Sequence, residues 1–306
     1  MPDPSARLPP PHLASRVGPG PGQSPLEAFD SEGASVRRHI LRLLPPDWSF
    51  EDKRVLDFGC GSGRVLRHFL ADAGHAELWG CDIDGPSIEW LQANLSPPVR
   101  CFQNGTEPPL PLESEYIDLM WATSVFTHIE HWAGWLLELH RVLRPGGILV
   151  ASFLGRGMWE ARVREPYRED QVGMTVVGAW RGPRADVLHS EWWLRAHWGR
   201  AFEVLDVAHP APNPDGSPAV AHSYIALRKR SGHFTREALE RIDPDEPREV
   251  LALETNVRVQ RYELAALAEQ RPLRELVRER LLRTLQRSPL IGPARLLRQH
   301  LRRSPR

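Results

Sequence analysis

The sequence predicts an α/β protein built on a doubly wound parallel sheet, followed by a helical C-terminal extension. Short apolar segments alternate with helical patterns as far as Val150, which is typical of parallel strands joined by helices. A glycine-rich turn after the first buried strand favours a ligand site at the carboxyl edge of that sheet. From Pro247 on, apolar residues recur at alternating spacings of three and four, which is typical of an amphipathic helix.

Composition and charge limit the classes of protein to be considered. The 306 residues suffice for one α/β domain with extensions, and the formal net charge of zero indicates no polyanionic partner. Cys60, Cys81 and Cys101 form no C-x-x-C pair and fall on or beside predicted strands, so we expect free thiols and no metal site. No apolar run approaches ~18 residues and the N-terminus lacks a signal-peptide pattern, so we expect a cytoplasmic protein.

The N-terminal region divides into two parts. Residues 1–30 are rich in proline and glycine and lack apolar periodicity, so we expect them to be disordered. A helix is predicted from Ser35 to Leu44, and Pro45-Pro46 ends it. The domain that carries the sheet is expected to cover residues 31–230.

The strongest functional signal lies in the segment Val55-Leu56-Asp57-Phe58-Gly59-Cys60-Gly61-Ser62-Gly63-Arg64-Val65. It predicts a buried strand, a turn with glycine at every second position, and a helix that starts near Arg64. Glycine permits positive φ and a close approach of ligand to backbone, and the N–H groups at a helix start face that ligand. The dinucleotide pattern G-x-G-x-x-G would need glycine where Arg64 stands, which disfavours an NAD-type oxidoreductase.

The next strand supplies an acidic residue at the distance expected for a ribose-binding carboxylate. The segment from Glu77 to Asp84 predicts a short apolar strand that ends in acid, and Asp82 follows the glycine turn by about 20 residues. We therefore expect Asp82, rather than Asp84, to accept hydrogen bonds from both ribose hydroxyls. The alternative is that Asp82 caps the helix predicted from Pro86 to Asn94.

The pattern D-x-G-x-G-x-G resembles motif I of class I methyltransferases, which bind S-adenosyl-L-methionine (SAM), and further segments follow in the order of that family. They are the third strand with its polar end (Val99 to Gly105), the run into strand four (Leu110 to Trp121), and the helix, Pro-Gly-Gly turn and fifth strand (Glu138 to Val150). By this resemblance residues 36–230 are identified as a member of the family. The resemblance implies a Rossmann-like sheet of seven strands with an antiparallel last strand. Its last two strands are expected at Phe202–Val207 and His222–Arg228.

The resemblance also implies the cofactor site. The residues expected to bind SAM are the turn glycines, the acids that end the first two strands, and residues near the ends of strands two to four: Asp57, Gly59, Gly61, Gly63, Asp82, Ile83, Asn104, Gly105 and Ala122. Asn104 stands where the family usually has Asp, and its amide can still accept a hydrogen bond from the adenine amino group. Asp57 is expected to orient the loop or the methionine ammonium. The alternative is a turn-forming acid that caps the next helix.

The segment after strand four indicates the acceptor class. From Trp121 to His131 it lacks the Asn/Asp-Pro-Pro-aromatic motif of enzymes that methylate amino groups, and the Pro-Cys pair of cytosine C5 enzymes is also absent. What remains resembles small-molecule methyltransferases, so we expect a hydroxyl of a sugar or other metabolite as the acceptor. His128 is the expected general base, because its unperturbed pKa lies near neutrality. The alternative is that His128 supports the helix after strand four and only lines the cofactor site.

An insertion over about residues 155–188 interrupts the pattern after strand five, and we expect it to lie over the carboxyl ends of the strands. A short hairpin is predicted within it, from Met174 to Trp180. Trp159 and Trp180 are expected to form a stacking wall for the acceptor, since a tryptophan offers a large flat apolar face. His189 is a second candidate base; the alternative is a polar surface residue at a helix entry.

The residue pattern of the C-terminal extension, residues 247–306, predicts contact surfaces. Coiled-coil spacing places six residues on one seam, which faces either its own domain or a second copy: Val250, Leu253, Val257, Gln260, Leu264 and Leu267. From Arg271 onward, eleven arginines against two glutamates predict Arg-rich amphipathic helices at about 274–286 and 293–303. Three interpretations of this tail stay open: a solvated helix face, a peripheral contact at the inner membrane face, and an arm that binds nucleic acid. Since no aromatics interleave with the arginines, we expect no nucleic acid.

Three classes of function follow. The first is a SAM-dependent methyltransferase acting on a small molecule, which the collinear motifs favour. The second is an NAD-type oxidoreductase, which Arg64 disfavours. The third is a non-catalytic SAM-binding scaffold that acts through the C-terminal helices, and the intact glycine turn argues against it.

Overall fold

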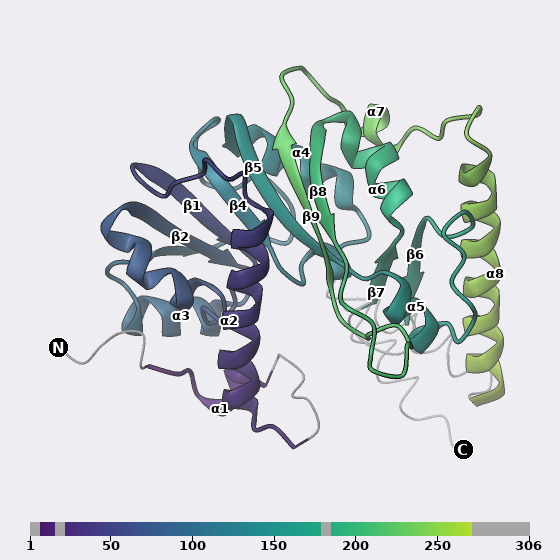
Figure 1. Ribbon diagram of the computed structural model, residues 1–306, viewed down its shortest axis with the longest axis horizontal. Coiled ribbons are helices and arrows are strands. Elements are labelled where there is room, and N and C mark those ends of the chain that lie inside the picture. Colours follow the sequence, from purple (N-terminus) through teal and green to yellow (C-terminus); the bar gives the residue numbers. More distant parts are fainter. Residues whose placement is uncertain (1–6, 16–21, 179–184, 271–306) are drawn as a thin grey trace, which may run out of the picture.

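The computed structural model describes residues 7–15, 22–178 and 185–270 (Figure 1). At its centre is a seven-stranded sheet with strand order β3-β2-β1-β4-β5-β9-β8, in which β9 runs antiparallel to both of its neighbours. The bounds are β1 Lys53–Phe58, β2 Ala76–Asp82, β3 Arg100–Gln103, β4 Ile117–Ala122, β5 Leu143–Phe153, β8 Phe202–Ala208 and β9 Ser223–Lys229. This order, with its antiparallel last hairpin, confirms the predicted fold class.

Helices cover both faces of the sheet. The bounds are α1 Pro11–Ala14, α2 Pro25–Leu43, α3 Gly85–Asn94, α4 Trp132–Val142, α5 Arg156–Arg162, α6 Glu191–His197, α7 Arg236–Glu240 and α8 Pro247–Gln270, with 3-10 helices η2 Leu66–Gly74, η3 Phe126–His128 and η4 Trp198–Arg200. Successive residues of β1 point to opposite faces, so Val55 packs with α2, η2 and α3, and Leu56 packs with α4 and α6. Among the described helices, none combines the length and apolarity of a membrane span.

Helix α2 starts ten residues before the predicted Ser35. The expectation of disorder up to residue 30 is wrong for residues 25–30 and also for α1, whose Leu13 and Ala14 are buried. The reason for the early start of α2 is a capping box: the Ser24 hydroxyl accepts from the Glu27 N–H at 3.2 Å, and the Glu27 carboxylate accepts from the Ser24 N–H at 2.9 Å. Pro25 at the first helical position adds to this start signal. The segment after motif I also differs from the prediction. The helix expected to start near Arg64 is a 3-10 helix, η2, which begins at Leu66.

The insertion carries a small second sheet in which β6 (Met174–Val177) pairs antiparallel with β7 (Asp186–His189). The expected hairpin is present, but its second strand lies further along the chain than residue 180. Leu154, just beyond β5, forms a bridge to Leu188, so the insertion continues from the end of β5. This places β7 at the carboxyl edge of the main sheet, where the insertion was expected.

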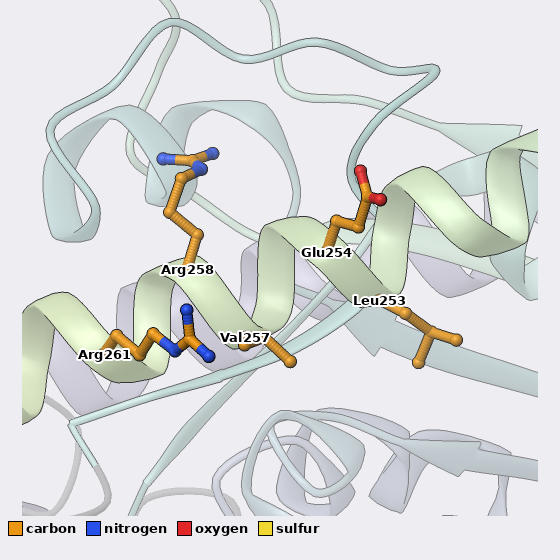
Figure 2. Close-up of a pocket in the computed structure, with 5 residues that line it drawn as sticks. All are labelled: Leu253, Glu254, Val257, Arg258 and Arg261. Carbon is orange, nitrogen blue, oxygen red and sulfur yellow. The ribbon is translucent and has the colours of Figure 1, made fainter.

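Helix α8 packs beside the insertion (Figure 1). Its buried face holds Ala252, Thr255, Val259 and Glu263, and the Glu263 carboxylate accepts from the Gly178 N–H at 2.8 Å. The coiled-coil seam lies on a different face: Val250, Leu253, Val257 and Leu264 are 46–54% exposed. Figure 2 shows the shallow groove along this outer face, lined by Leu253, Glu254, Val257, Arg258 and Arg261. The helix therefore docks on its own domain. Of the six seam residues, Gln260 takes part, since its side-chain amide donates to the Val176 carbonyl of β6, whereas the four exposed apolar residues face away.

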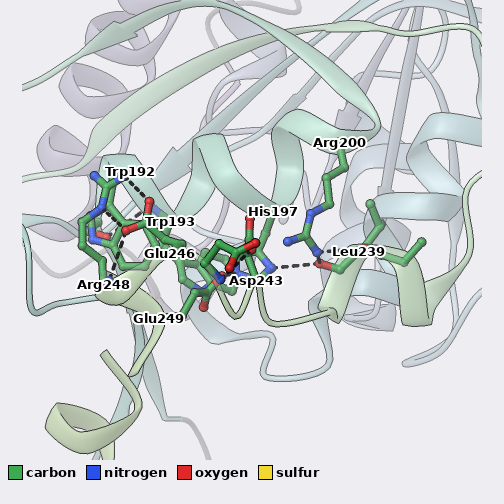
Figure 3. A network of polar contacts seen from close by, with 12 residues as sticks. Trp192, Trp193, His197, Arg200, Leu239, Asp243, Glu246, Arg248 and Glu249 are labelled. Atoms are coloured by element: carbon green, nitrogen blue, oxygen red, sulfur yellow. Dashed lines mark hydrogen bonds and ion pairs between the residues drawn. The ribbon is translucent and has the colours of Figure 1, made fainter. Parts of the chain in front are cut away.

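A buried polar contact fastens α8 to α6 (Figure 3). The His197 Nε2 lies 3.0 Å from a Glu249 carboxylate oxygen, both side chains are buried, and the His197 Nδ1 lies 2.8 Å from the Leu239 carbonyl oxygen. Arg248 stacks over Trp192, with its guanidinium carbon 4.8 Å from the ring centroid. The described part of the C-terminal extension is thus integral to the domain. The helices expected beyond residue 270 lie outside the described residues.

Candidate functional site

Four parallel strands bring the predicted site residues to one edge of the sheet. The register pairs Phe58 of β1 with Cys81 of β2, Asp57 of β1 with Trp121 of β4, and Asp82 of β2 with Gln103 of β3. The carboxyl ends of β1 to β4 therefore meet where the glycine turn leaves β1. Open α/β sheets bind ligands at such an edge.

All three glycines of the turn adopt positive φ, namely +81° at Gly59, +51° at Gly61 and +83° at Gly63. Two of them are required by packing, since an added Cβ would come 2.3 Å from Val125 at Gly59 and 2.7 Å from Leu91 at Gly63. At Gly61 an added Cβ would meet no described atom within 4 Å. The turn therefore packs tightly on both sides and leaves open space at its tip, as a ligand cradle requires.

Asp82 lies beside this open space. One carboxylate oxygen accepts from the Gly61 N–H at 2.7 Å and the other from the Asp84 N–H at 2.8 Å. These bonds fix the carboxylate, and each oxygen keeps acceptor capacity for a ligand hydroxyl. The alternative that Asp82 caps the next helix is wrong, because Asp84 is the cap of α3 and accepts from the Ser87 N–H at 3.0 Å.

Asn104 and Ile83 lie at the ends of the neighbouring strands. The Asn104 N–H donates to the Asp82 carbonyl at 3.1 Å, and its side-chain amide donates to the Gly105 carbonyl at 2.8 Å. This leaves the buried Asn104 Oδ1 without a partner among the described residues, so an acceptor is free for an amino group. Ile83 is 54% exposed and offers an apolar surface to a flat ring, while Ala122 ends β4 fully buried.

Asp57 is a buried carboxyl group at the base of the turn. It is 1% exposed, and its Oδ2 has no hydrogen-bond partner among the described residues. Burial raises the pKa of Asp57 to about 7, and the Trp121 side chain partly offsets this rise. A ligand ammonium nearby would favour the ionised form. The free acceptors at Asp57 and Asn104 and the cradle at Gly61 fit SAM, which carries an ammonium, an adenine amino group and a ribose.

His128 ends the short helix η3 and is held by the insertion. Its Nδ1 lies 2.9 Å from the Ala185 carbonyl oxygen and 3.9 Å from an Asp186 carboxylate oxygen. Asp186 in turn pairs with Arg162 at 3.0 Å. A carbonyl partner requires the proton on Nδ1, so Nε2 of the neutral ring carries the lone pair of a base. The ring is 35% exposed, which leaves it accessible.

Two neighbouring features had no sequence signal. His222 directly precedes β9 at the same edge, and its pKa is lowered to about 4 by burial and by the charges of Arg64 and His128. Ser124, just beyond β4, has φ +61°, and its N–H donates to the Ser152 hydroxyl at 2.7 Å. Strained backbone of this kind gathers at functional sites. A histidine that opens a strand and a serine in a loop are too common for sequence reasoning to single out.

The predicted acceptor wall needs correction. Trp159 is 2% exposed and packs inside the apolar cluster of the insertion, so its face is not available for stacking. His189 is fully buried, with its ring 5.4 Å from that of Trp193 and 5.9 Å from that of Trp198. Burial lowers the pKa of His189 to about 3, which excludes both a surface residue and an accessible base. Trp180 lies outside the described residues.

Comparisons with known proteins agree with this geometry. Residues 56–151 match the family model described as a methyltransferase domain. The chain is 29% identical over 167 residues to a malonyl-acyl-carrier protein O-methyltransferase of Pseudescherichia vulneris, covering 51% of this chain and 65% of that protein. It is 33% identical over 172 residues to a tRNA U34 carboxymethyltransferase of Cellvibrio japonicus, covering 54% of this chain and 51% of that protein. The chain thus spans less than two thirds of either relative.

A solved structure shares the fold. It is a SAM-dependent methyltransferase from Mesorhizobium loti, with a TM-score of 0.51 and 17% identity, covering 65% of this chain and 99% of that one. The strand order and the match at residues 56–151 assign the same class to this protein. The chain carries a class I SAM-dependent methyltransferase domain, for which SAM is the cofactor.

Proposed function

We propose that this protein transfers the methyl group of SAM to a hydroxyl of a small molecule, such as a sugar or another metabolite, with His128 as general base. The carrying observation is the contact of the His128 Nδ1 with the Ala185 carbonyl at 2.9 Å, which leaves Nε2 as the proton acceptor. The O-methyltransferase activity named for one relative supports an oxygen acceptor.

Each residue at the carboxyl edge of the sheet would have a separate role. When bound, SAM supplies an electrophilic methyl group on its sulfonium. Asp82 would hold the ribose, Asn104 the adenine amino group, and Asp57 the ammonium of the methionyl end. His128 would take the proton of the acceptor hydroxyl as its oxygen attacks the methyl carbon. Holding donor and acceptor in line and excluding water would supply much of the rate.

The outer seam of α8 supports a second candidate, a SAM-binding scaffold that acts by association with a second copy. Leu253 and Val257 are 47% and 50% exposed on this face (Figure 2). Glu254 and Arg261 flank the seam two turns apart. An antiparallel second copy would bring each of them opposite the other, so the surface complements itself in charge.

Methyl transfer from SAM with a labelled methyl group separates these candidates. We expect label in hydroxyl compounds from a panel of sugars, phenols and hydroxy acids, and none in matched amines or in transfer RNA. Label confined to amines or to RNA would contradict the hydroxyl proposal. SAM binding without transfer to any class would favour the scaffold.

A further inference from the structure

Arg64 is a half-buried cation at the far side of the glycine turn, and its backbone is closely packed. It follows Gly63 directly, whose φ of +83° turns the chain there. Helix α2 lies against this point, since a Cβ added to Gly33 would come 2.0 Å from the Arg64 carbonyl oxygen. The contact holds the loop backbone in place and therefore fixes where the side chain begins.

The guanidinium of Arg64 has no bonded partner among the described residues, in contrast to other partly buried arginines. Arg141 pairs with Glu138 at 2.6 Å, and Arg67 lies 3.5 Å from an Asp30 carboxylate oxygen. Within the described ranges, Arg64 forms no hydrogen bond or ion pair of this kind. Its charge acts on Asp57 and His222 from a distance, and burial lowers its pKa. A cation so placed favours an anionic ligand.

Asp57 supplies the opposite charge at the base of the turn. Its Oδ2 lacks a described partner, and Arg64 is not close enough to bond it. A separated carboxylate and guanidinium match a ligand that carries both an ammonium and a carboxylate, as an amino-acid group does. Asp82 is bonded to Gly61 at the tip of the turn, so a ribose held by Asp82 directs the rest of the ligand along the turn.

We propose that Arg64 binds the carboxylate of the methionyl group of SAM, across the turn from Asp57, which faces the ammonium. The inference rests on the proposed function, because it assumes that SAM occupies the carboxyl edge. It assigns to Arg64 a role that goes beyond the glycine pattern. Arg64 occupies the position where a dinucleotide-binding site would have its third glycine, and here it would bind the ligand itself.

The test compares SAM with decarboxylated SAM, which lacks only the carboxylate, by calorimetric titration. Wild-type protein is expected to bind SAM about 10- to 100-fold more tightly than decarboxylated SAM. Arg64→Met is expected to lose that preference by weakening SAM alone, and Arg64→Lys to keep part of it. Arg38→Met, which removes an exposed arginine of α2, is the matched control and should keep the full preference.

Three results would contradict the role of Arg64 or the function on which it rests. Equal affinity of the wild-type protein for the two ligands would overturn the role of Arg64 even if Arg64→Met fails to fold. Equal weakening of both ligands by Arg64→Met would overturn it as well, since that pattern indicates a general loss of the site. Binding of neither ligand to the wild-type protein would instead contradict the proposed function.

Discussion

Replacing His128 by alanine is expected to lower turnover of a hydroxyl acceptor by about 10²–10⁴ while leaving the affinity for SAM unchanged. The contact between His128 Nδ1 and the Ala185 carbonyl fixes the ring with Nε2 as the proton acceptor, and alanine removes that group. The measurement is the steady-state rate with an acceptor from the hydroxyl panel, together with a calorimetric titration of SAM.

His131→Ala is the matched control for this variant. His131 is exposed, precedes α4, and makes no side-chain capping bond, so its loss should leave both the rate and the affinity as they are. An unchanged rate in His128→Ala would remove His128 as the base and favour catalysis by proximity alone. A loss of SAM affinity would support the alternative that His128 lines the cofactor site.

Gly61→Val is expected to abolish SAM binding. The affinity for SAM should fall by roughly two orders of magnitude or more, which corresponds to about 2.7 kcal/mol of binding free energy. The tip of the turn is open at Gly61, where an added Cβ meets no described atom within 4 Å, and a valine would fill the space that a ligand needs. Calorimetry with SAM measures the effect directly.

Gly146→Val controls for backbone strain. Gly146 has φ +73° and likewise no atom within 4 Å of an added Cβ, but it lies at the opposite end of β5 from the cradle. Both valines are strained at positive φ, by roughly 1–2 kcal/mol. Gly146→Val should therefore lose about as much stability as Gly61→Val, but it should retain SAM binding. Equal retention of binding by Gly61→Val would contradict the placement of the ligand at the turn.

The fold and the cofactor edge could be predicted because their signals are local in the sequence. The strand ending at Phe58 and the glycine turn form one continuous segment, and Asp82 follows at the spacing of a β-α-β unit. Parallel strands then place these carboxyl ends together without further information.

The acceptor side could not be predicted because its residues are placed by long-range contacts. Local pattern gives no sign that Trp159 packs inside the insertion, or that His189 is enclosed by Trp193 and Trp198. His222 reaches the site only because β9 runs antiparallel, which puts its first residues at the carboxyl edge. Such positions depend on tertiary packing and not on periodicity.

Helix faces were equally hard to assign from spacing alone. Spacing grouped six residues of α8 into one seam, yet four of them are exposed and the helix docks mainly through Ala252, Thr255 and Glu263. The buried Glu263 carboxylate accepts the backbone N–H of Gly178 with both of its oxygens, a contact that no helical pattern encodes. Polar contacts of this kind decide which face of an amphipathic helix turns inward.

Calorimetric titration of the wild-type protein with SAM and with NAD tests most directly whether the carboxyl edge is a SAM site. We expect heat of binding with SAM only, because the Gly61 cradle and the Asp82 carboxylate suit a ribose, while Arg64 stands where a dinucleotide site needs a third glycine. Binding of NAD and not of SAM would contradict it.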